Sequence, residues 1–249
     1  MAQSVLFTLN DETQELCLPD CDEEVLPGVK WGHHYATFTP SFWASLAWYN
    51  KTDERPENHR LGDTLAEEIT ACLLGGYGIP SEVGLAAFRR LKESGLLQNT
   101  LVPESRLFEA LSPPLDVSGR QIRYRFAPQR SNYVSAALAR LAEVEAPIND
   151  DLAFRQWLLD FRGIGPKTAS WITRNWLNSE KVAIIDIHIQ RAGLLMGLFK
   201  KDESPVRHYF RMEEKFLAFA NNIGVRASFL DALIWRQMKD AGSMIFKLL

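Results

Sequence analysis

Residues 161–172 read FRGIGPKTASWI, and this stretch decides the fold prediction. Gly163 and Gly165 flank a single residue and permit a tight turn, because glycine adopts positive φ angles and lets another backbone approach closely. Pro166 follows at once, and proline is favoured at the first position of a helix. The pattern predicts two helices joined by a short hairpin, a helix-hairpin-helix over about residues 153–176.

The start of the second helix is also a natural place to bind an anion. Its first backbone amides point outward, where the helix dipole favours negative charge. We therefore expect Gly163, Ile164 and Gly165 to bind a phosphate of a DNA backbone. An αα-hairpin that needs its glycines only to turn the chain is the alternative, since a GxG pattern is not specific on its own.

Two residues with reactive side chains follow this hairpin. Lys167 lies directly after it, on the first turn of the second helix, and a deprotonated lysine amine is a competent nucleophile. Asp186 comes after an apolar run and begins a helical pattern, so its carboxylate can cap that helix. A carboxylate can also stabilise positive charge that develops at a sugar carbon. Lys167 and Asp186 together predict a site that breaks an N-glycosidic bond.

The hairpin, the lysine and the aspartate together resemble the helix-hairpin-helix DNA glycosylase superfamily, over GIGPKTA at 163–169 and IDIH at 185–188. In that superfamily a lysine at the position of Lys167 marks the bifunctional branch, which combines base excision with abasic-site (AP) lyase activity. The D-x-H arrangement of Asp186 and His188 is similar to that of 8-oxoguanine DNA glycosylases. We expect His188 to bond the DNA backbone, or to be a structural hydrogen-bonding residue, rather than to act as a catalytic base.

The cysteines separate the branches of this superfamily. Endonuclease III-like and many adenine-glycosylase-like members carry a four-cysteine iron–sulfur cluster near the C-terminus. Here the three cysteines are Cys17, Cys21 and Cys72, so we expect no iron–sulfur cluster, no other metal and no required cofactor. The resemblance adds a monovalent cation as an optional ligand of the hairpin carbonyls. The short N-terminal part is more like compact microbial or archaeal members than like the eukaryotic type.

The expected base pocket lies near the C-terminus. Asp231 and Trp235 are one turn apart in a helical pattern, hence on one face. A carboxylate can accept hydrogen bonds from guanine, and an indole can stack on a purine. Archaeal 8-oxoguanine glycosylases use a D-x-x-x-W pair in this way, and the resemblance implies the same use here. The alternative is a tryptophan packed in the core beside an exposed aspartate.

A loop between two helical patterns, GGYGIP at 75–80, is the expected position of a wedge residue. Family members carry a wedge there that fills the gap left by a flipped base. Tyr77 is the wedge candidate, and a tyrosine packed over a helix end is the alternative.

Helical periodicity dominates the chain and predicts a mainly α fold with a small N-terminal β-hairpin at 4–18. The resemblance implies that this is a two-lobed helix-hairpin-helix DNA glycosylase fold. The predicted helices cover about 40–49, 61–74, 81–97, 103–111, 131–145, 150–161, 166–177, 187–198, 204–222 and 226–241. We expect three parts: an acidic N-terminal arm at 1–30, a lobe of 31–59 plus 182–249 with the base pocket, and a lobe of 60–181 with the hairpin. The active cleft is expected between the lobes.

Composition and charge are compatible with a DNA partner. A hydrophobic fraction of 46% excludes disorder, and the chain contains no run of 18 apolar residues that could span a membrane. The net charge of −3 is unevenly spread, because residues 1–30 hold seven acidic residues against Lys30 alone. The odd number of cysteines and the absence of a signal-like start lead us to expect a protein of the prokaryotic cytoplasm, associated with the nucleoid.

We therefore predict a bifunctional DNA glycosylase and AP lyase of base excision repair, a monomer that acts on damaged double-stranded DNA. It flips out and excises 8-oxoguanine through a Schiff base on Lys167, followed by β-elimination. One alternative is the same chemistry on another modified base, such as an oxidised pyrimidine or a modification of foreign DNA. The other alternative is a non-catalytic helix-hairpin-helix module that only binds DNA.

Overall fold

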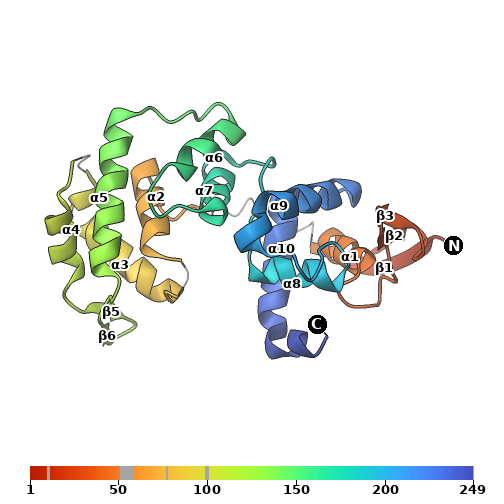
Figure 1. Ribbon diagram of the computed structural model, residues 1–249. Coiled ribbons are helices and arrows are strands. Elements are labelled where there is room, and N and C mark those ends of the chain that lie inside the picture. The colour runs from red at the N-terminus through yellow and green to blue at the C-terminus, as the bar shows by residue number, and fades with distance from the viewer. Residues whose placement is uncertain (10–11, 51–58, 77, 99–100, 249) are drawn as a thin grey trace. The chain divides into compact units, whose positions relative to one another are not determined.

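The computed structural model describes residues 1–9, 12–50, 59–76, 78–98 and 101–248. These residues form ten α-helices and three two-stranded antiparallel sheets, which confirms a mainly α fold (Figure 1). The chain divides into two compact units. Unit 1 consists of Met1–Glu57 and Ser179–Leu249, and unit 2 consists of Asn58–Asn178. None of the helices in the described ranges is long and apolar enough to cross a membrane.

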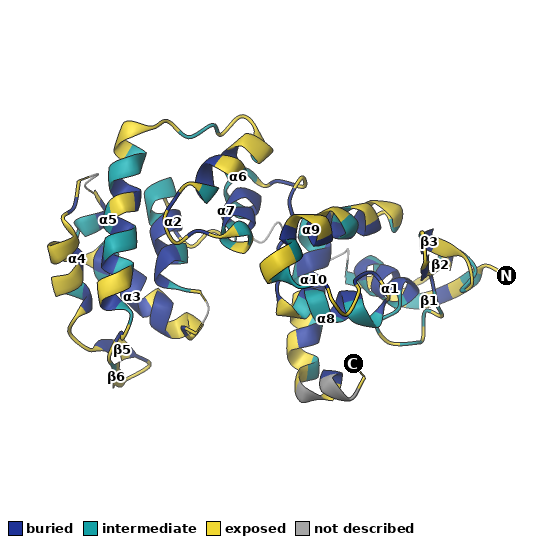
Figure 2. Ribbon diagram, viewed as in Figure 1, coloured by how far each residue is buried: buried dark blue, intermediate teal, exposed yellow. Residues whose placement is uncertain are grey.

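Unit 2 is helical apart from one short hairpin. Its elements are α2 (Leu65–Leu74), α3 (Ser81–Glu93), η2 (Leu96–Gln98), α4 (Glu104–Leu111), β5 (Leu115–Val117), β6 (Arg120–Ile122), α5 (Ala127–Glu143), α6 (Asp151–Leu159) and α7 (Pro166–Leu177). Five helices each contribute a fully buried side chain to one core, namely Ile69, Leu107, Val134, Phe154 and Ile172. The buried positions recur along one side of each helix, as helical periodicity requires (Figure 2).

Unit 1 combines the two ends of the chain. Its elements are β1 (Gln3–Leu9), β2 (Glu12–Leu18), β3 (Glu24–Leu26), β4 (Val29–Lys30), α1 (Pro40–Asn50), α8 (Ile187–Leu195), α9 (Pro205–Asn222), α10 (Ala227–Ala241) and η3 (Gly242–Lys247). Trp43 of α1 is fully buried and belongs to the same hydrophobic cluster as Phe216 and Phe219 of α9 and Leu230 of α10. This unit therefore needs both terminal segments to complete its core.

The N-terminal strands belong to that core. Strands β1 and β2 pair from Gln3↔Leu18 to Leu9↔Glu12, so alternate side chains point to opposite faces. Val5 and Leu18 are buried in the cluster, whereas Leu6 is 65% exposed. The predicted N-terminal hairpin is confirmed, and it packs as an integral layer of unit 1.

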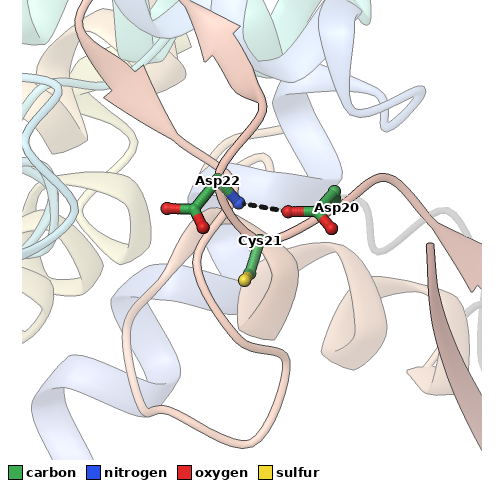
Figure 3. Close-up of side chains that lie close together, drawn as sticks. All are labelled: Asp20, Cys21 and Asp22. Atoms are coloured by element: carbon green, nitrogen blue, oxygen red, sulfur yellow. Dashed lines mark hydrogen bonds between the residues drawn. The ribbon is translucent and has the colours of Figure 1, made fainter. Parts of the chain in front are cut away.

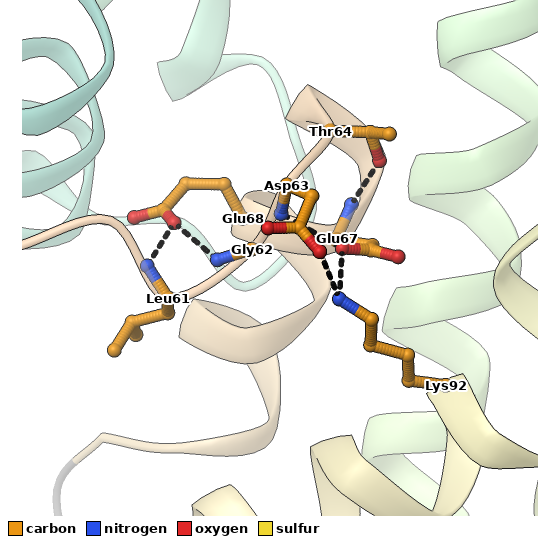
Figure 4. Close-up of polar contacts among 7 residues, drawn as sticks. All are labelled: Leu61, Gly62, Asp63, Thr64, Glu67, Glu68 and Lys92. Carbon is orange, nitrogen blue, oxygen red and sulfur yellow. Dashed lines mark hydrogen bonds and ion pairs between the residues drawn. The ribbon is translucent and has the colours of Figure 1, made fainter.

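The segment that enters unit 2 is held by a buried carboxylate (Figure 4). Glu68 of α2 is fully buried and accepts hydrogen bonds from the amides of Leu61 at 2.6 Å and Gly62 at 3.0 Å. Burial raises the pKa of Glu68, although these two amides favour its charged form. Nearby, Lys92 of α3 pairs with Glu67 at 2.8 Å, which ties α3 to the first turn of α2.

Two helix starts differ from the sequence-based expectation. Helix α2 begins at Leu65 rather than near 61, because the side chain of Thr64 caps it by accepting from the Glu67 amide. Helix α5 begins at Ala127 rather than near 131, because Pro128 fits within a first helical turn, where its missing N–H costs nothing.

The hairpin β5–β6 was not predicted, since the sequence patterns indicate no helix or strand between residues 111 and 131. Ser118 and Gly119 both have positive φ angles, 53° and 80°, which is the signature of a tight hairpin turn. Leu115 and Val117 point into the core of unit 2 and are buried. Three-residue strands are too short to show a readable alternation in the sequence.

Candidate active site

The predicted helix-hairpin-helix is formed by α6, the turn at 160–165 and α7. Gly163 has a φ angle of +91°, and a Cβ atom there would lie 2.4 Å from Cδ2 of Tyr133 on α5. Glycine is therefore required at this position by conformation and by space. Ile164 is buried and its amide donates to the Phe161 carbonyl at 3.0 Å, which anchors the turn to the end of α6.

The start of α7 is exposed. Gly165 is the N-cap residue of α7, and a Cβ atom on it would meet nothing within 4 Å. Pro166 occupies the first turn, and no side chain of the described residues caps the helix. The first-turn amides of an uncapped helix carry partial positive charge, so this end of α7 suits an anion.

Lys167 lies on that first turn and its side chain is exposed. It is two residues from Gly165, on the same helix end that offers the amides. Unit 2 therefore places an uncapped helix start beside a primary amine. Gly163, Gly165 and Lys167 lie at this turn, the Ile164 amide donates within the chain to Phe161, and binding of a phosphate here stays a prediction.

Asp186, in unit 1, is the N-cap residue of α8. Its Oδ1 atom accepts from the His188 amide at 2.8 Å and from the Ile189 amide at 2.9 Å. The residue is 9% exposed, and Oδ2 makes no hydrogen bond in the described part of the chain. The cap fixes the carboxylate through one oxygen and leaves the second oxygen for a ligand.

His188 and Trp235 contact each other in unit 1. Their ring centroids lie 6.2 Å apart with an interplanar angle of 75°, an edge-to-face arrangement. The Nδ1 atom of His188 is buried and has no hydrogen-bond partner among the described residues. Trp235 is 43% exposed, and the Lys239 ammonium lies 4.6 Å from the centre of its ring.

Asp231 is 3% exposed, and its Oδ2 atom accepts from the Ile184 amide at 3.2 Å. The alternative of a buried tryptophan beside an exposed aspartate is therefore wrong, because the burial of the two side chains is the reverse. Asp231 and Trp235 lie one turn apart on α10, as predicted. Tyr77, the wedge candidate, lies outside the described residues.

The stretch that contains the hairpin, Lys167 and Asp186 also matches a known protein family. Residues 54–225 match a family model described as 8-oxoguanine DNA glycosylase. The chain belongs to the 8-oxoguanine DNA glycosylase family. A relative from Saccharolobus islandicus (strain Y.N.15.51 / Yellowstone #2), named 8-oxoguanine DNA glycosylase/AP lyase, is 30% identical over an alignment 197 residues long, which covers 73% of this chain and 88% of the relative.

Solved 8-oxoguanine DNA glycosylases share the fold. That of Methanocaldococcus jannaschii has a TM-score of 0.59 at 22% identity and covers 81% of this chain and 94% of its own. That of Thermotoga maritima has a TM-score of 0.58 at 22% identity, with 80% and 95% covered. The family match begins after α1 and ends before Asp231, so the N-terminal strands and α10 lie outside it.

In this member of the 8-oxoguanine DNA glycosylase family, the packing of two arginines on Tyr133 beside the hairpin was not predicted. Tyr133 of α5 lies under the hairpin, with the guanidinium groups of Arg130 and Arg162 each 5.5 Å from its ring centre. Arg162 also donates to Asn132 at 2.8 Å. A basic residue before the first hairpin glycine is the only sequence signal for this packing.

Three side chains of the kinds that bind metal ions lie close together in the N-terminal region, namely Asp20, Cys21 and Asp22 (Figure 3). Asp20 accepts from the Asp22 amide at 2.9 Å, and Asp22 pairs with Lys30 at 2.8 Å. The hydrogen bond and the charge of Lys30 lower the pKa of Asp22. Both carboxylates thus have partners in the N-terminal region, the Asp22 amide and Lys30 of β4, and none of the contacts named here joins this group to Lys167 or Asp186.

Proposed function

We propose that this protein is a bifunctional DNA glycosylase and AP lyase of base excision repair that removes 8-oxoguanine from duplex DNA. The observation that carries the proposal is the exposed amine of Lys167 on the uncapped first turn of α7, directly after the hairpin. Membership of the 8-oxoguanine DNA glycosylase family supports the choice of substrate.

DNA binding begins at the hairpin. The amides of Gly163 and Gly165 and those of the first turn of α7 hold one backbone phosphate, because open space at Gly165 and the positive end of the helix dipole coincide there. The carbonyls of Arg162, Gly163 and Ile164 accept no backbone hydrogen bond in the described chain, so their oxygens are available as ligands of a monovalent cation. Such a cation would add positive charge beside the phosphate, and the chemistry below does not depend on it.

The damaged nucleotide leaves the base stack before reaction. Unstacking costs a few kcal/mol, and less at a damaged pair. In this proposal Trp235 stacks on the flipped purine, Asp231 accepts hydrogen bonds from it, His188 bonds the DNA backbone, and Tyr77 fills the gap in the duplex. The exposed ring of Trp235 supports its part, since 43% of that residue is accessible.

Lys167 is the nucleophile. Its neutral amine forms a bond to C1′ of the deoxyribose while the C1′–N9 bond breaks, and the base leaves with the electron pair and takes up a proton. Opening of the C1′–O4′ bond then gives a Schiff base. Removal of a C2′ proton expels the 3′ phosphate by β-elimination, which nicks the strand.

Asp186 stabilises the positive charge that develops on the sugar as the base departs. Its cap hydrogen bonds use Oδ1 and hold the side chain in one orientation, which leaves Oδ2 to face the sugar. Lys167 and Asp186 belong to different units, so the proposal requires both units to contact the DNA. We further propose that the protein acts as a monomer on genomic DNA, in the cytoplasm of a prokaryotic cell.

Borohydride trapping tests the nucleophile and the substrate together. The substrate is a duplex with one 8-oxoguanine opposite cytosine, beside undamaged, uracil and abasic duplexes. We expect a covalent adduct on the 8-oxoguanine strand that is lost in Lys167→Gln and kept in Lys181→Gln, a control at another exposed lysine. Excision by Lys167→Gln should fall by on the order of 10³-fold or more.

Each other outcome revises a particular part of the proposal. An adduct only on the abasic duplex keeps the lyase chemistry and overturns 8-oxoguanine as the base. An adduct that survives in Lys167→Gln overturns the nucleophile. Absence of any adduct or excision leaves a protein that uses the hairpin for DNA binding alone.

A further inference from the structure

The four residues before Asp186 form a buried segment that belongs to no helix or strand, and no strand pairs with it in the described chain. Val182, Ala183 and Ile185 are fully buried, and Ile184 is 7% exposed. Buried backbone amides need hydrogen-bond partners, and each one left without a partner costs about 1–3 kcal/mol. The partners of this segment must therefore come from side chains.

Three successive amides donate to three different side chains. Ala183 donates to Glu213 Oε1 at 3.0 Å, and Ile184 donates to Asp231 Oδ2 at 3.2 Å. Ile185 donates to the Tyr209 hydroxyl at 3.2 Å. The Tyr209 hydroxyl in turn donates to the Ala183 carbonyl at 2.8 Å, which closes the set.

These side chains are rigidly placed. Tyr209 and Glu213 lie one turn apart on α9, and each is 4% exposed. Asp231 comes from the neighbouring α10. Two helices thus hold the backbone of the segment at fixed points, and its last hydrogen-bonded residue, Ile185, is joined directly to Asp186 by one peptide bond.

We infer that Tyr209 and Glu213 are positioning residues for Asp186: they hold the backbone at 183–185 so that the carboxylate of Asp186 stays aligned with the sugar. This inference rests on the proposed function, and it assigns no contact with DNA to either residue. Alignment matters because a displacement of about 1 Å at a reacting group can cost about 10²-fold in rate. Asp231 also holds this backbone, because it accepts from the Ile184 amide. Asp231 therefore has two roles in the proposal: it contacts the base and it helps to position Asp186.

The test uses conservative variants and single-turnover excision of 8-oxoguanine. Tyr209→Phe keeps the ring and removes both of these hydrogen bonds. We expect excision to become about tenfold to hundredfold slower, because a displacement of the Asp186 carboxylate of up to about 1 Å costs that much in rate. Glu213→Gln keeps the accepting Oε1 atom and should stay within about threefold of wild type, whereas Glu213→Ala should match Tyr209→Phe. The affinity for lesion duplex and the borohydride trapping on abasic DNA should not change.

A double-variant measurement separates positioning from general weakening of the fold. If Tyr209 acts through Asp186, Tyr209→Phe should slow excision in the wild type and add almost nothing in Asp186→Asn. Ser45→Ala is the matched control, because it removes another buried hydroxyl of unit 1 that donates to a backbone carbonyl, that of Ser41, at 2.7 Å. We expect its excision rate to equal that of the wild type.

The failures are distinguishable. A wild-type excision rate in Tyr209→Phe, or an equal loss in both backgrounds, overturns the inference while leaving the proposed function in place. A wild-type rate in Asp186→Asn overturns the role of Asp186 and the inference with it. No excision of 8-oxoguanine by the wild-type protein overturns the proposed function itself.

Discussion

Lys167 and Asp186 show two ways in which a fold presents a reactive side chain. Lys167 is exposed on a helix end that carries positive partial charge, so its surroundings favour an anion beside it. Asp186 is nearly buried, and two amides hold it through a single oxygen. The amine is thus exposed and the carboxylate is held in place, which suits a nucleophile and an electrostatic stabiliser respectively.

Glu203 is the residue for which pH should affect stability most directly. Burial alone would raise the pKa of Glu203, but the Lys200 amide, Lys215 and Arg211 outweigh it and lower that pKa to about 2. Lys215 lies 2.9 Å and Arg211 2.6 Å from Oε1 of this carboxylate, which is 1% exposed. The ionised form is therefore favoured in the folded state.

The sign of the pH effect follows from this lowered pKa. The stabilisation by Glu203 is fully present above its ordinary pKa of 4.5 and is lost as the pH falls toward 2. Glu203→Gln should lower the free energy of unfolding by about 2 kcal/mol at pH 7 and by much less at pH 3. Urea unfolding at both pH values, with the exposed Glu214→Gln as control, checks this; an equal loss at both would contradict it.

At the scale of the element, the two hairpin glycines have different tasks. Gly163→Ala places a Cβ atom against Tyr133 at a positive φ angle, so we expect a loss of more than about 1 kcal/mol of stability together with weaker DNA binding. Gly165 has an ordinary φ of −100° and open space around it. Gly165→Ala should therefore keep most of the stability and weaken binding to DNA, because its methyl group occupies the space of the phosphate.

Thermal unfolding and fluorescence anisotropy with duplex DNA separate these two effects. We expect Gly163→Ala to lose both stability and affinity for DNA, and Gly165→Ala to lose mainly affinity. If Gly165→Ala binds duplex DNA as tightly as the wild type, the hairpin does not hold a phosphate at this point.

At the scale of the whole molecule, the N-terminal region is structural although it lies outside the family match. Val5, Leu18, Val25 and Val29 are buried in the same cluster as Trp43. Burial of a valine or leucine side chain contributes roughly 1.5–3 kcal/mol, so deletion of residues 1–30 should cost at least about 5 kcal/mol. We expect the fragment 31–249 to unfold at a much lower temperature or to fail to fold.

Two point variants make the same prediction without a deletion. Val5→Ala should lower the free energy of unfolding by about 1–2 kcal/mol, because the side chain is 7% exposed. Leu6→Ala, one residue along the same strand, should change it by less than about 0.5 kcal/mol, since Leu6 is 65% exposed. Equal effects at both positions would show that the hairpin does not pack on unit 1 in solution.

Local patterns in the sequence were sufficient for several features. The helix start at Pro166, the cap at Asp186 and the one-turn spacing of Asp231 and Trp235 are all confirmed, because each depends on residues within one or two helical turns. The β5–β6 hairpin and the start of α5 were missed. Pro128 is a local signal for the start of α5 that helical periodicity does not register, whereas the hairpin depends on the turn at Ser118-Gly119 and on the burial of Leu115.

The sequence by itself determined the mainly α fold, the helix-hairpin-helix and the candidate residues Lys167 and Asp186, since helical periodicity, glycine conformation and helix capping are short-range effects. Only the tertiary structure decided that the first 30 residues complete the core of unit 1, that Asp231 is buried, and that Tyr209 and Glu213 hold the backbone before Asp186. The physical reason is that burial and the pairing of backbone amides depend on residues far apart in the chain, such as Ile185 and Tyr209, and no local pattern records which of them meet.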